Sequence, residues 1–232
     1  MLKEKRPRGE RSPLPVNLII IAIAAAVYLS LVSPVSIMTA AGASNLPKYR
    51  GTDADSVSLV CAVSWEAAAL EDIFAALEMA GEKIAFAVTP SLGKARPELL
   101  SEIVSRGHEL ALLAENGGRN HASASEMEEA ASLFESAAGE KPKLFFCTAE
   151  NAEKNAKAAK KAGLICVVGT ADLNCASGGA EDIAKRLENC LSGGGVYIAS
   201  PTRAFAEALP VILKSIKKTG FRIVKAYEML YN

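Results

Sequence analysis

The stretch VSLVCAVSWEAAALEDIFAALEMAGEKIAFAV, residues 57–88, decides the fold, because it has the pattern of a strand, a helix and a second strand. Its two outer runs, VSLVCAV and KIAFAV, are apolar almost throughout instead of alternating, which predicts strands buried on both faces. Gly81 follows the helical stretch between them, at a position where glycine can end a helix. Strands of this kind joined by helices predict a parallel sheet covered by helices.

The same alternation continues to the C-terminus. The seven strand candidates are VSLVCAV, KIAFAV, ELALLA, KLFFCT, LICVVG, VYIAS and FRIV. The clearest helix covers 204–218, where apolar residues recur every three or four positions, and Ser125 with Glu128 has the spacing of a capping box. The pattern leaves two architectures open, an open doubly wound sheet and a small, incomplete βα barrel.

Composition limits the function classes. The chain has 232 residues, half of them apolar, which is enough for one sizeable domain plus an extra segment. Lys and Arg together number 26, as do Asp and Glu, so no net charge favours nucleic acid, and we expect no nucleic-acid partner. No glycine-rich phosphate-binding motif follows the first strand, and the SGGG run at 192–195 precedes a strand, which predicts a turn.

The N-terminal region predicts a membrane anchor. We expect a cytoplasmic basic tail over 1–15, a transmembrane or signal-anchor helix over 16–38, a linker over 39–55 and the globular domain over 56–232. The tail carries more Lys and Arg than Glu, so the positive-inside rule predicts a single-pass protein with its globular domain outside the cytoplasm. The alternative is a secreted protein, cleaved near Ala43.

The chain has five cysteines and no C-x-x-C spacing, which favours neither a zinc site nor a complete disulfide framework. Cys61, Cys147 and Cys166 lie in apolar runs and are predicted to be buried apolar thiols. Whether Cys175 and Cys190 form a disulfide stays open from the sequence.

In either architecture function is expected at the C-terminal ends of the strands. The ligand-binding candidates there are Trp65, Glu115, Asn116, Asp172, Ser200 and Arg203. Trp65 either caps the core or stacks on a sugar ring. His108 precedes its strand, which predicts a structural role on the opposite rim, and His121 lies in a loop on the functional side with no second ligand near it in sequence.

At this point the order of motifs resembles the polysaccharide deacetylase family, the NodB-homology domain of carbohydrate esterase family 4. The resemblance runs from 57–113 through the closing GGGVYIAS to KAYEML, residues 193–230, and RPELLSEIVSRGHEL, residues 96–110, is its most specific piece. It implies a distorted seven-stranded (β/α) barrel of the polysaccharide deacetylase type.

The resemblance also implies that the family's functional residues are absent. The catalytic base, the metal-binding aspartate, the two metal-binding histidines, the arginine of the third motif and the closing catalytic histidine fall respectively on Ala62, Val63, Leu113, Gly117, Phe146 and Ser200. Of the second motif only His108 and Glu109 remain, which in the family precede the ligands. The resemblance therefore implies no metal, no cofactor and no catalytic set.

Two hypotheses follow. The first is a membrane-anchored, extracytoplasmic pseudo-deacetylase that binds cell-wall glycan or holds an envelope protein. The alternative is a divergent, metal-independent hydrolase of cell-wall carbohydrate, with Glu115, Asp172 and His121 as acid and base.

Overall fold

The computed structural model describes residues 45–65, 68–115 and 121–231, which belong to one compact unit, 43–232. The predicted basic tail, the predicted span and Ala43 lie outside the described residues. Within the described part of the chain no helix is long and apolar enough to cross a membrane.

The described residues form one parallel sheet. Its strands are β1 (Ser56–Val63), β2 (Ala85–Val88), β3 (Glu109–Leu113), β4 (Leu144–Phe146), β5 (Ile165–Val167), β6 (Ala171–Asp172), β7 (Val196–Ala199) and β8 (Arg222–Ile223). Their order is β5-β4-β3-β2-β1-β7-β6, and β8 pairs with the beginning of β1. Every predicted run contains a strand; the two-residue β6 is the strand that the sequence pattern missed.

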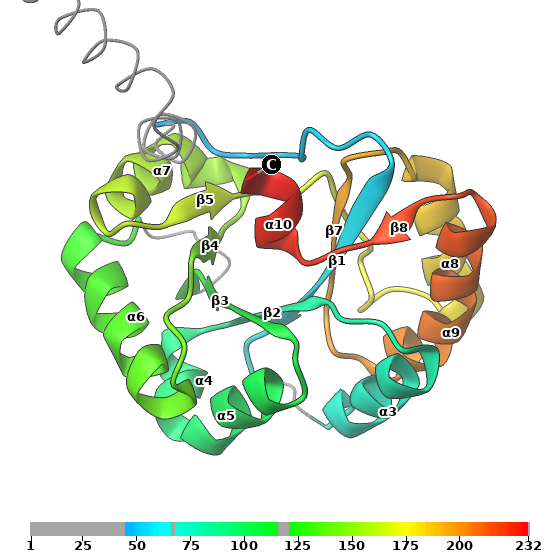
Figure 1. The fold of residues 1–232 in the computed structure, drawn as a ribbon, viewed down its shortest axis with the longest axis horizontal. Coiled ribbons are helices and arrows are strands. Elements are labelled where there is room, and N and C mark those ends of the chain that lie inside the picture. Colours follow the sequence, from blue (N-terminus) through cyan, green and yellow to red (C-terminus); the bar gives the residue numbers. More distant parts are fainter. Residues whose placement is uncertain (1–44, 66–67, 116–120, 232) are drawn as a thin grey trace, which may run out of the picture. The chain divides into compact units, whose positions relative to one another are not determined.

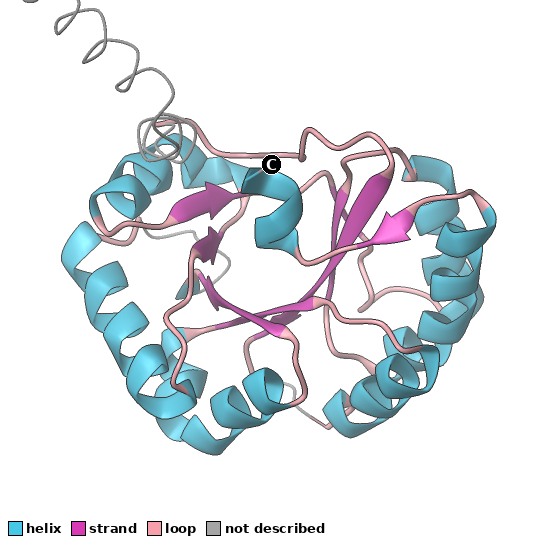
Figure 2. Ribbon diagram, viewed as in Figure 1, coloured by secondary structure: helices cyan, strands magenta, loops and turns pink. Residues whose placement is uncertain are grey.

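Helices cover the convex side of the curved sheet (Figures 1 and 2). They are α3 (Leu70–Ala80), α4 (Pro90–Ala95), α5 (Pro97–Ser105), α6 (Ala124–Ala138), α7 (Ala152–Lys161), α8 (Ala180–Cys190) and α9 (Arg203–Lys218), with a 3-10 turn η2 (Ala149–Asn151) before α7. The last helix, α10 (Ala226–Tyr231), lies on the concave side. Among the described residues no ladder joins β5 to β6, so the sheet is a parallel half-barrel.

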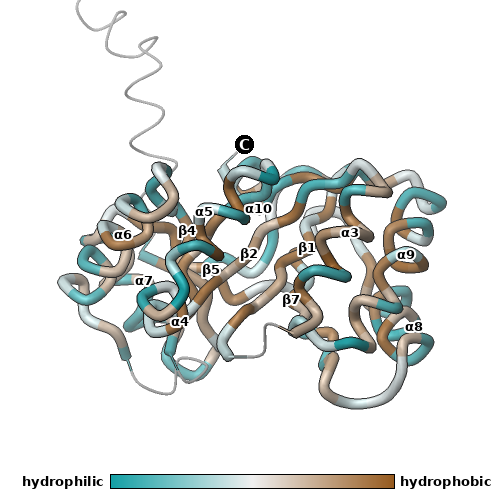
Figure 3. Tube along the Cα trace, turned by 90° about the horizontal axis from the view of Figure 1, so that it is seen from below, coloured by the Kyte–Doolittle hydropathy of each residue, from teal (hydrophilic) through white to brown (hydrophobic). Residues whose placement is uncertain are grey.

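Two apolar cores follow from the alternation of side chains along the strands. Leu59, Cys61 and Val63 of β1 face the helices, whereas Val60 packs on the concave side with Met229 of α10. Figure 3 shows hydrophobic residues along the central strands and hydrophilic ones on the outer helices. Both faces of each strand are therefore buried, which is why the strands are apolar throughout.

The start of α6 corrects one prediction from the sequence. Ser123, not Ser125, is the N-cap: its Oγ accepts from the Glu126 backbone N at 3.2 Å, and the Ser123 backbone N donates to Glu126 Oε2 at 2.7 Å. The Ser-x-x-Glu spacing occurs twice in succession, and periodicity alone chose the inner copy, which lies within the helix.

Residues 48–51 lie across the open side of the sheet: the segment contacts β5 at one end and the turn before β7 at the other. The Lys48 backbone N donates to Cys166 O at 2.8 Å, and the Gly51 backbone N donates to Gly194 O at 2.8 Å. The Thr170 hydroxyl donates to Tyr49 O at 2.8 Å. This part of the predicted linker is therefore hydrogen-bonded to the domain, a role that its turn-forming composition did not reveal.

The predicted structural role of His108 is confirmed. Its Nδ1 accepts from the Ile84 backbone N at 3.4 Å, and its ring lies 5.7 Å from that of Phe74 and 5.1 Å from that of Phe86. Next to it, both carboxylate oxygens of Glu109 accept from the Tyr227 backbone N, at 3.1 and 3.2 Å, at the start of α10. This pair therefore fastens the N-terminal rim of the sheet.

Candidate functional site

The C-terminal ends of the strands surround a cavity of about 500 Å³, the rim cavity. Its lining residues are Ala62, Ser64, Trp65, Thr89, Leu113, Ala114, Glu115, Phe146, Cys147, Thr148, Ala149, Val168, Gly169, Thr170, Ala171, Asp172, Ile198 and Ser200. They come from the seven strands β1 to β7 or from the turns that follow them, because parallel strands all end at the same edge. The sequence predicted function at this edge.

The positions where the resemblance places catalytic and metal-binding groups carry no carboxylate, imidazole or guanidinium group. Ala62, Leu113 and Phe146 line the rim cavity, as does Ser200. Val63 is fully buried among the residues that pack against the helices. Gly117 lies outside the described residues, as does Asn116.

The residues present do not fit the divalent cation that the resemblance implies for active members of the family. Such an ion takes imidazole nitrogens and carboxylate oxygens, which Val63 and Leu113 cannot provide. Nowhere in the described part of the chain do three or more His, Cys, Asp or Glu side chains form a group that could hold a metal.

Glu115 and Asp172 line the same cavity, although each already binds backbone. Glu115 Oε1 accepts from the Ser91 backbone N at 2.7 Å, in the first turn of α4. Asp172 Oδ1 accepts from the Asn174 backbone N at 2.8 Å. The structure thus brings these two predicted acids to one cavity, and gives each a role in holding a turn.

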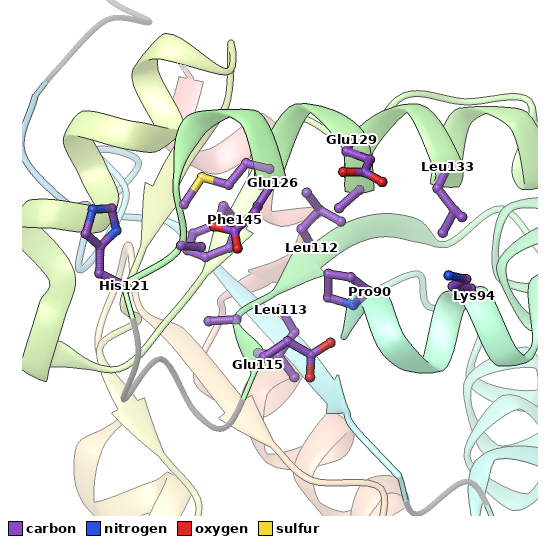
Figure 4. A pocket seen from close by; sticks show the side chains of 14 residues that line it. Pro90, Lys94, Leu112, Leu113, Glu115, His121, Glu126, Glu129, Leu133 and Phe145 are labelled. Carbon is purple, nitrogen blue, oxygen red and sulfur yellow. The ribbon is translucent and has the colours of Figure 1, made fainter.

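His121 lies in a different place. It lines a cavity of about 400 Å³ between α4 and α6, with Glu115 at the boundary of the two cavities. In Figure 4, His121 and Glu115 lie on different parts of its wall and do not point toward one another. The predicted grouping of Glu115, Asp172 and His121 is therefore not assembled around the rim cavity.

Trp65 is exposed to 70%, so of the two interpretations of this side chain the core cap is wrong. It lines both the rim cavity and a neighbouring groove of about 810 Å³, the Trp65 groove, which Thr202, Arg203 and Glu207 also line. Arg203 is held by an ion pair from its Nε to Glu207 Oε1 at 2.9 Å. Trp65 thus belongs to the walls of both the rim cavity and the Trp65 groove, at the C-terminal ends of the strands.

The predicted burial of Cys61, Cys147 and Cys166 is confirmed, but the place of Cys147 in the cavity wall was not predicted. Cys147 lies at the wall of the rim cavity, and its Sγ is 3.5 Å from Cys166 Sγ. The signal was present, since both cysteines lie in apolar runs, but the pairing of β4 with β5 was needed to bring them together. All five cysteines, Cys175 and Cys190 included, are free thiols in the structure.

Comparison with known proteins shows which solved structures have the same fold. No family model and no curated protein matches the sequence. Among solved structures, wild-type BA3943 of Bacillus anthracis, described as a pseudoenzyme of carbohydrate esterase family 4, matches with a TM-score of 0.72 and 19% identity, over 80% of this chain and 69% of that chain.

Two further structures agree. A mutant of the same pseudoenzyme, described as having restored enzymatic activity, matches with a TM-score of 0.73 and 19% identity, over 80% of this chain and 71% of that chain. The Bc1960 peptidoglycan N-acetylglucosamine deacetylase matches with a TM-score of 0.69 and 18% identity, over 79% of this chain and 92% of that chain. This chain therefore has the fold of the carbohydrate esterase family 4 polysaccharide deacetylases, as its motif order predicted.

Proposed function

We propose that this chain is a divergent, non-catalytic member of the polysaccharide deacetylase family that binds cell-wall glycan. The observation that carries the proposal is the position of Trp65, an exposed indole that joins the rim cavity to the Trp65 groove. Exposed large aromatic side chains beside concave surfaces are frequent binding sites.

The chemistry of the two hollows suits a sugar. The indole offers an apolar face against the C–H face of a pyranose ring, and an N–H donor at its edge. Hydroxyls of Ser64, Thr148 and Ser200 and the carboxylate of Asp172 line the rim cavity, and they can exchange hydrogen bonds with sugar hydroxyls. An extended glycan can use both hollows, since Trp65 belongs to each.

Hydrolysis of an acetamide requires groups that this cavity lacks at the family positions. A metal-dependent deacetylase polarises the carbonyl with a cation and activates water with a base. Ala62 and Leu113 provide neither, and apolar replacements remove the cost of burying unpaired ligands. The Bacillus anthracis pseudoenzyme supports the proposal, because it combines this fold with that description.

We further propose that the N-terminal region tethers the domain to the outer side of a membrane. The support is the uncharged run from Ser12 to Pro47, preceded by the basic tail. Cleavage near Ala43 would instead release the domain, and the N-terminus of the exported protein distinguishes these outcomes.

Replacing Trp65 with alanine is expected to weaken binding of chito-oligosaccharide or peptidoglycan fragments by about ten-fold or more, because a central aromatic contact typically contributes over ~1.4 kcal/mol. Calorimetric titration of the full chain measures the change. Trp65→Phe should retain part of the affinity, and Met79→Ala, at a side chain that is 90% exposed on α3, should retain all of it. Equal affinities for wild type and Trp65→Ala, or binding only to an envelope protein, would contradict the glycan proposal.

A metal-independent hydrolase is the second candidate, favoured by the placement of Glu115 and Asp172 in one cavity. On this hypothesis Glu115→Gln or Asp172→Asn should lower release of acetate or reducing ends from envelope glycans at least ~100-fold, the scale of a lost acid or base. The assay includes chelator, so that metal-dependent contaminants are silent. If wild type releases no product, this candidate fails while the glycan-binding proposal stands.

A further inference from the structure

Two thiols from neighbouring strands meet at the edge of the rim cavity. Cys147 directly follows β4, and Cys166 lies in β5. The strands are held in parallel register up to this point, because the Cys147 backbone N donates to Val167 O at 3.0 Å. Both side chains face the helices, and their sulfur atoms are 3.5 Å apart.

The surroundings of the pair favour a thiolate on one sulfur. Asn155 of α7 is fully buried; its Oδ1 accepts from the Ala122 backbone N at 3.2 Å, and its Nδ2 has no hydrogen-bond partner among the described residues. The hydrogen bond from Cys166 is the main cause that lowers the pKa of Cys147, against its burial, and the Asn155 side chain lowers it further. The same interaction raises the pKa of Cys166.

The two cysteines differ in their position relative to the rim cavity. Cys147 is among the residues that line it, whereas Cys166, whose Sγ lies 3.8 Å from Ala152 O, is not. Both residues are buried, with exposed fractions of 5% and 4%. Cys147 therefore has the place of an attacking thiol, at the cavity wall, and Cys166 that of a resolving thiol behind it.

We propose that Cys147 and Cys166 form a thiol–disulfide exchange site whose substrate is an organic disulfide entering through the rim cavity. The proposal goes beyond glycan binding and does not depend on it. It rests on the 3.5 Å separation of the sulfurs, the unpaired Asn155 amide and the place of Cys147 in the wall of the rim cavity.

The exchange balances as two substitutions. The Cys147 thiolate attacks one sulfur of the organic disulfide, forms a mixed disulfide and expels the other half as a thiolate, which takes a proton. Cys166 then loses its proton and attacks Cys147 Sγ, which expels the second half. The protein dithiol is oxidised to a disulfide and the organic disulfide is reduced to two thiols, with no further oxidant.

Closing the bond requires the sulfurs to move from 3.5 Å to about 2.05 Å. Cys166 contacts the carbonyl of Ala152 at the start of α7, and Asn155 of the same helix holds Ala122. Oxidation should therefore shift α7 and the residues beside the rim cavity.

The test uses the folded full chain, first reduced and then incubated with glutathione disulfide. Iodoacetamide labelling after unfolding should find five free thiols before the incubation and three after it, since two of the five cysteines become bonded. Peptide mapping should assign the new bond to Cys147 and Cys166. No bond between them, or a bond between Cys175 and Cys190 instead, overturns the proposal.

Variants separate the two roles. Cys166→Ser should accumulate a stable mixed disulfide on Cys147, Cys147→Ser should accumulate none on Cys166, and Cys175→Ser should behave as wild type. Asn155→Asp keeps the acceptor for Ala122 but replaces the donor with a negative charge, and should slow glutathionylation of Cys147 several-fold at neutral pH. Equal rates for Asn155→Asp and wild type, or adducts spread over all cysteines, would contradict the assigned site.

Discussion

Replacing Gly193 with alanine is expected to lower the free energy of unfolding by about 3 kcal/mol or more, the upper range for overpacking against atoms that cannot move. A Cβ on Gly193 would overlap the backbone carbonyl of Ala54. Around this contact the Gly194 backbone N donates to Ser56 O at 2.7 Å, and the Ser58 backbone N donates to Gly195 O at 2.9 Å. The added methyl group must push the chain entering β1 away from the turn before β7.

Gly81→Ala is the matched control. Gly81 has φ +68°, and a Cβ there would meet no atom within 4 Å, so the substitution should cost only the left-handed conformation, roughly 1–2 kcal/mol. Urea unfolding of both variants measures the difference. A Gly193→Ala variant no less stable than Gly81→Ala would show that residues 51–56 do not pack on the SGGG turn as described.

The second large effect concerns His108 and Glu109. Their contributions to the pH dependence of the free energy of unfolding are expected to cancel in the wild type. Burial, with smaller contributions from Lys83, Lys225 and Arg106, lowers the pKa of His108 from 6.5 to about 4. Burial raises the pKa of Glu109 from 4.5 to about 7, against the hydrogen bonds from the Tyr227 and Ala226 backbone.

The two shifts act in opposite directions. As pH falls from 6.5 to 4, the unfolded chain protonates His108 before the folded chain does, so stability is lost. As pH falls from about 7 to 4.5, the folded chain protonates Glu109 first, so stability is gained; this gain is lost again as pH rises through 7. Each shift corresponds to about 3 kcal/mol, at 1.36 kcal/mol per pKa unit.

Single variants should separate the contributions of His108 and Glu109 to the change of stability with pH. Relative to wild type, Glu109→Gln should lose about 3 kcal/mol as pH falls from 7 to 4, because only the His108 contribution remains. His108→Asn, which keeps an acceptor for the Ile84 backbone N, should gain stability over the same interval. Urea unfolding at several pH values measures both, with the double variant as control. Parallel profiles for Glu109→Gln and wild type would contradict the assignment.

These contacts explain why the most specific piece of the resemblance occurs together with an apolar cavity. RPELLSEIVSRGHEL contributes Leu99, Leu100 and Ile103 to the helix-side core, and its His108 and Glu109 fasten β2 and α10. None of these residues lies on the rim cavity. Folding depends on this stretch whichever side chains line the opposite edge, so the stretch and an apolar cavity can occur in the same chain.

The amino-acid sequence was enough to predict the alternation of strands and helices, the burial of both strand faces and the edge of the sheet where the candidate site lies. These properties are local or periodic: apolar runs, a helical stripe over 204–218 and the order of motifs all lie along the chain. The exact start of α6 was an exception, because the Ser-x-x-Glu spacing occurs twice, two residues apart. The structure assigned the N-cap to Ser123.

The contacts between side chains that are far apart in the chain could not be predicted and follow from the packing of the elements. In the structure, Glu115 and Asp172 line one cavity and His121 lines another, while Trp65 is exposed. Cys147 contacts Cys166, and Gly193 packs against the backbone of Ala54. Each of these contacts depends on strand order, sheet curvature or the path of residues 48–51. The physical reason is that local preferences fix the direction of each element, whereas distances between residues far apart in the chain arise only when the elements pack together.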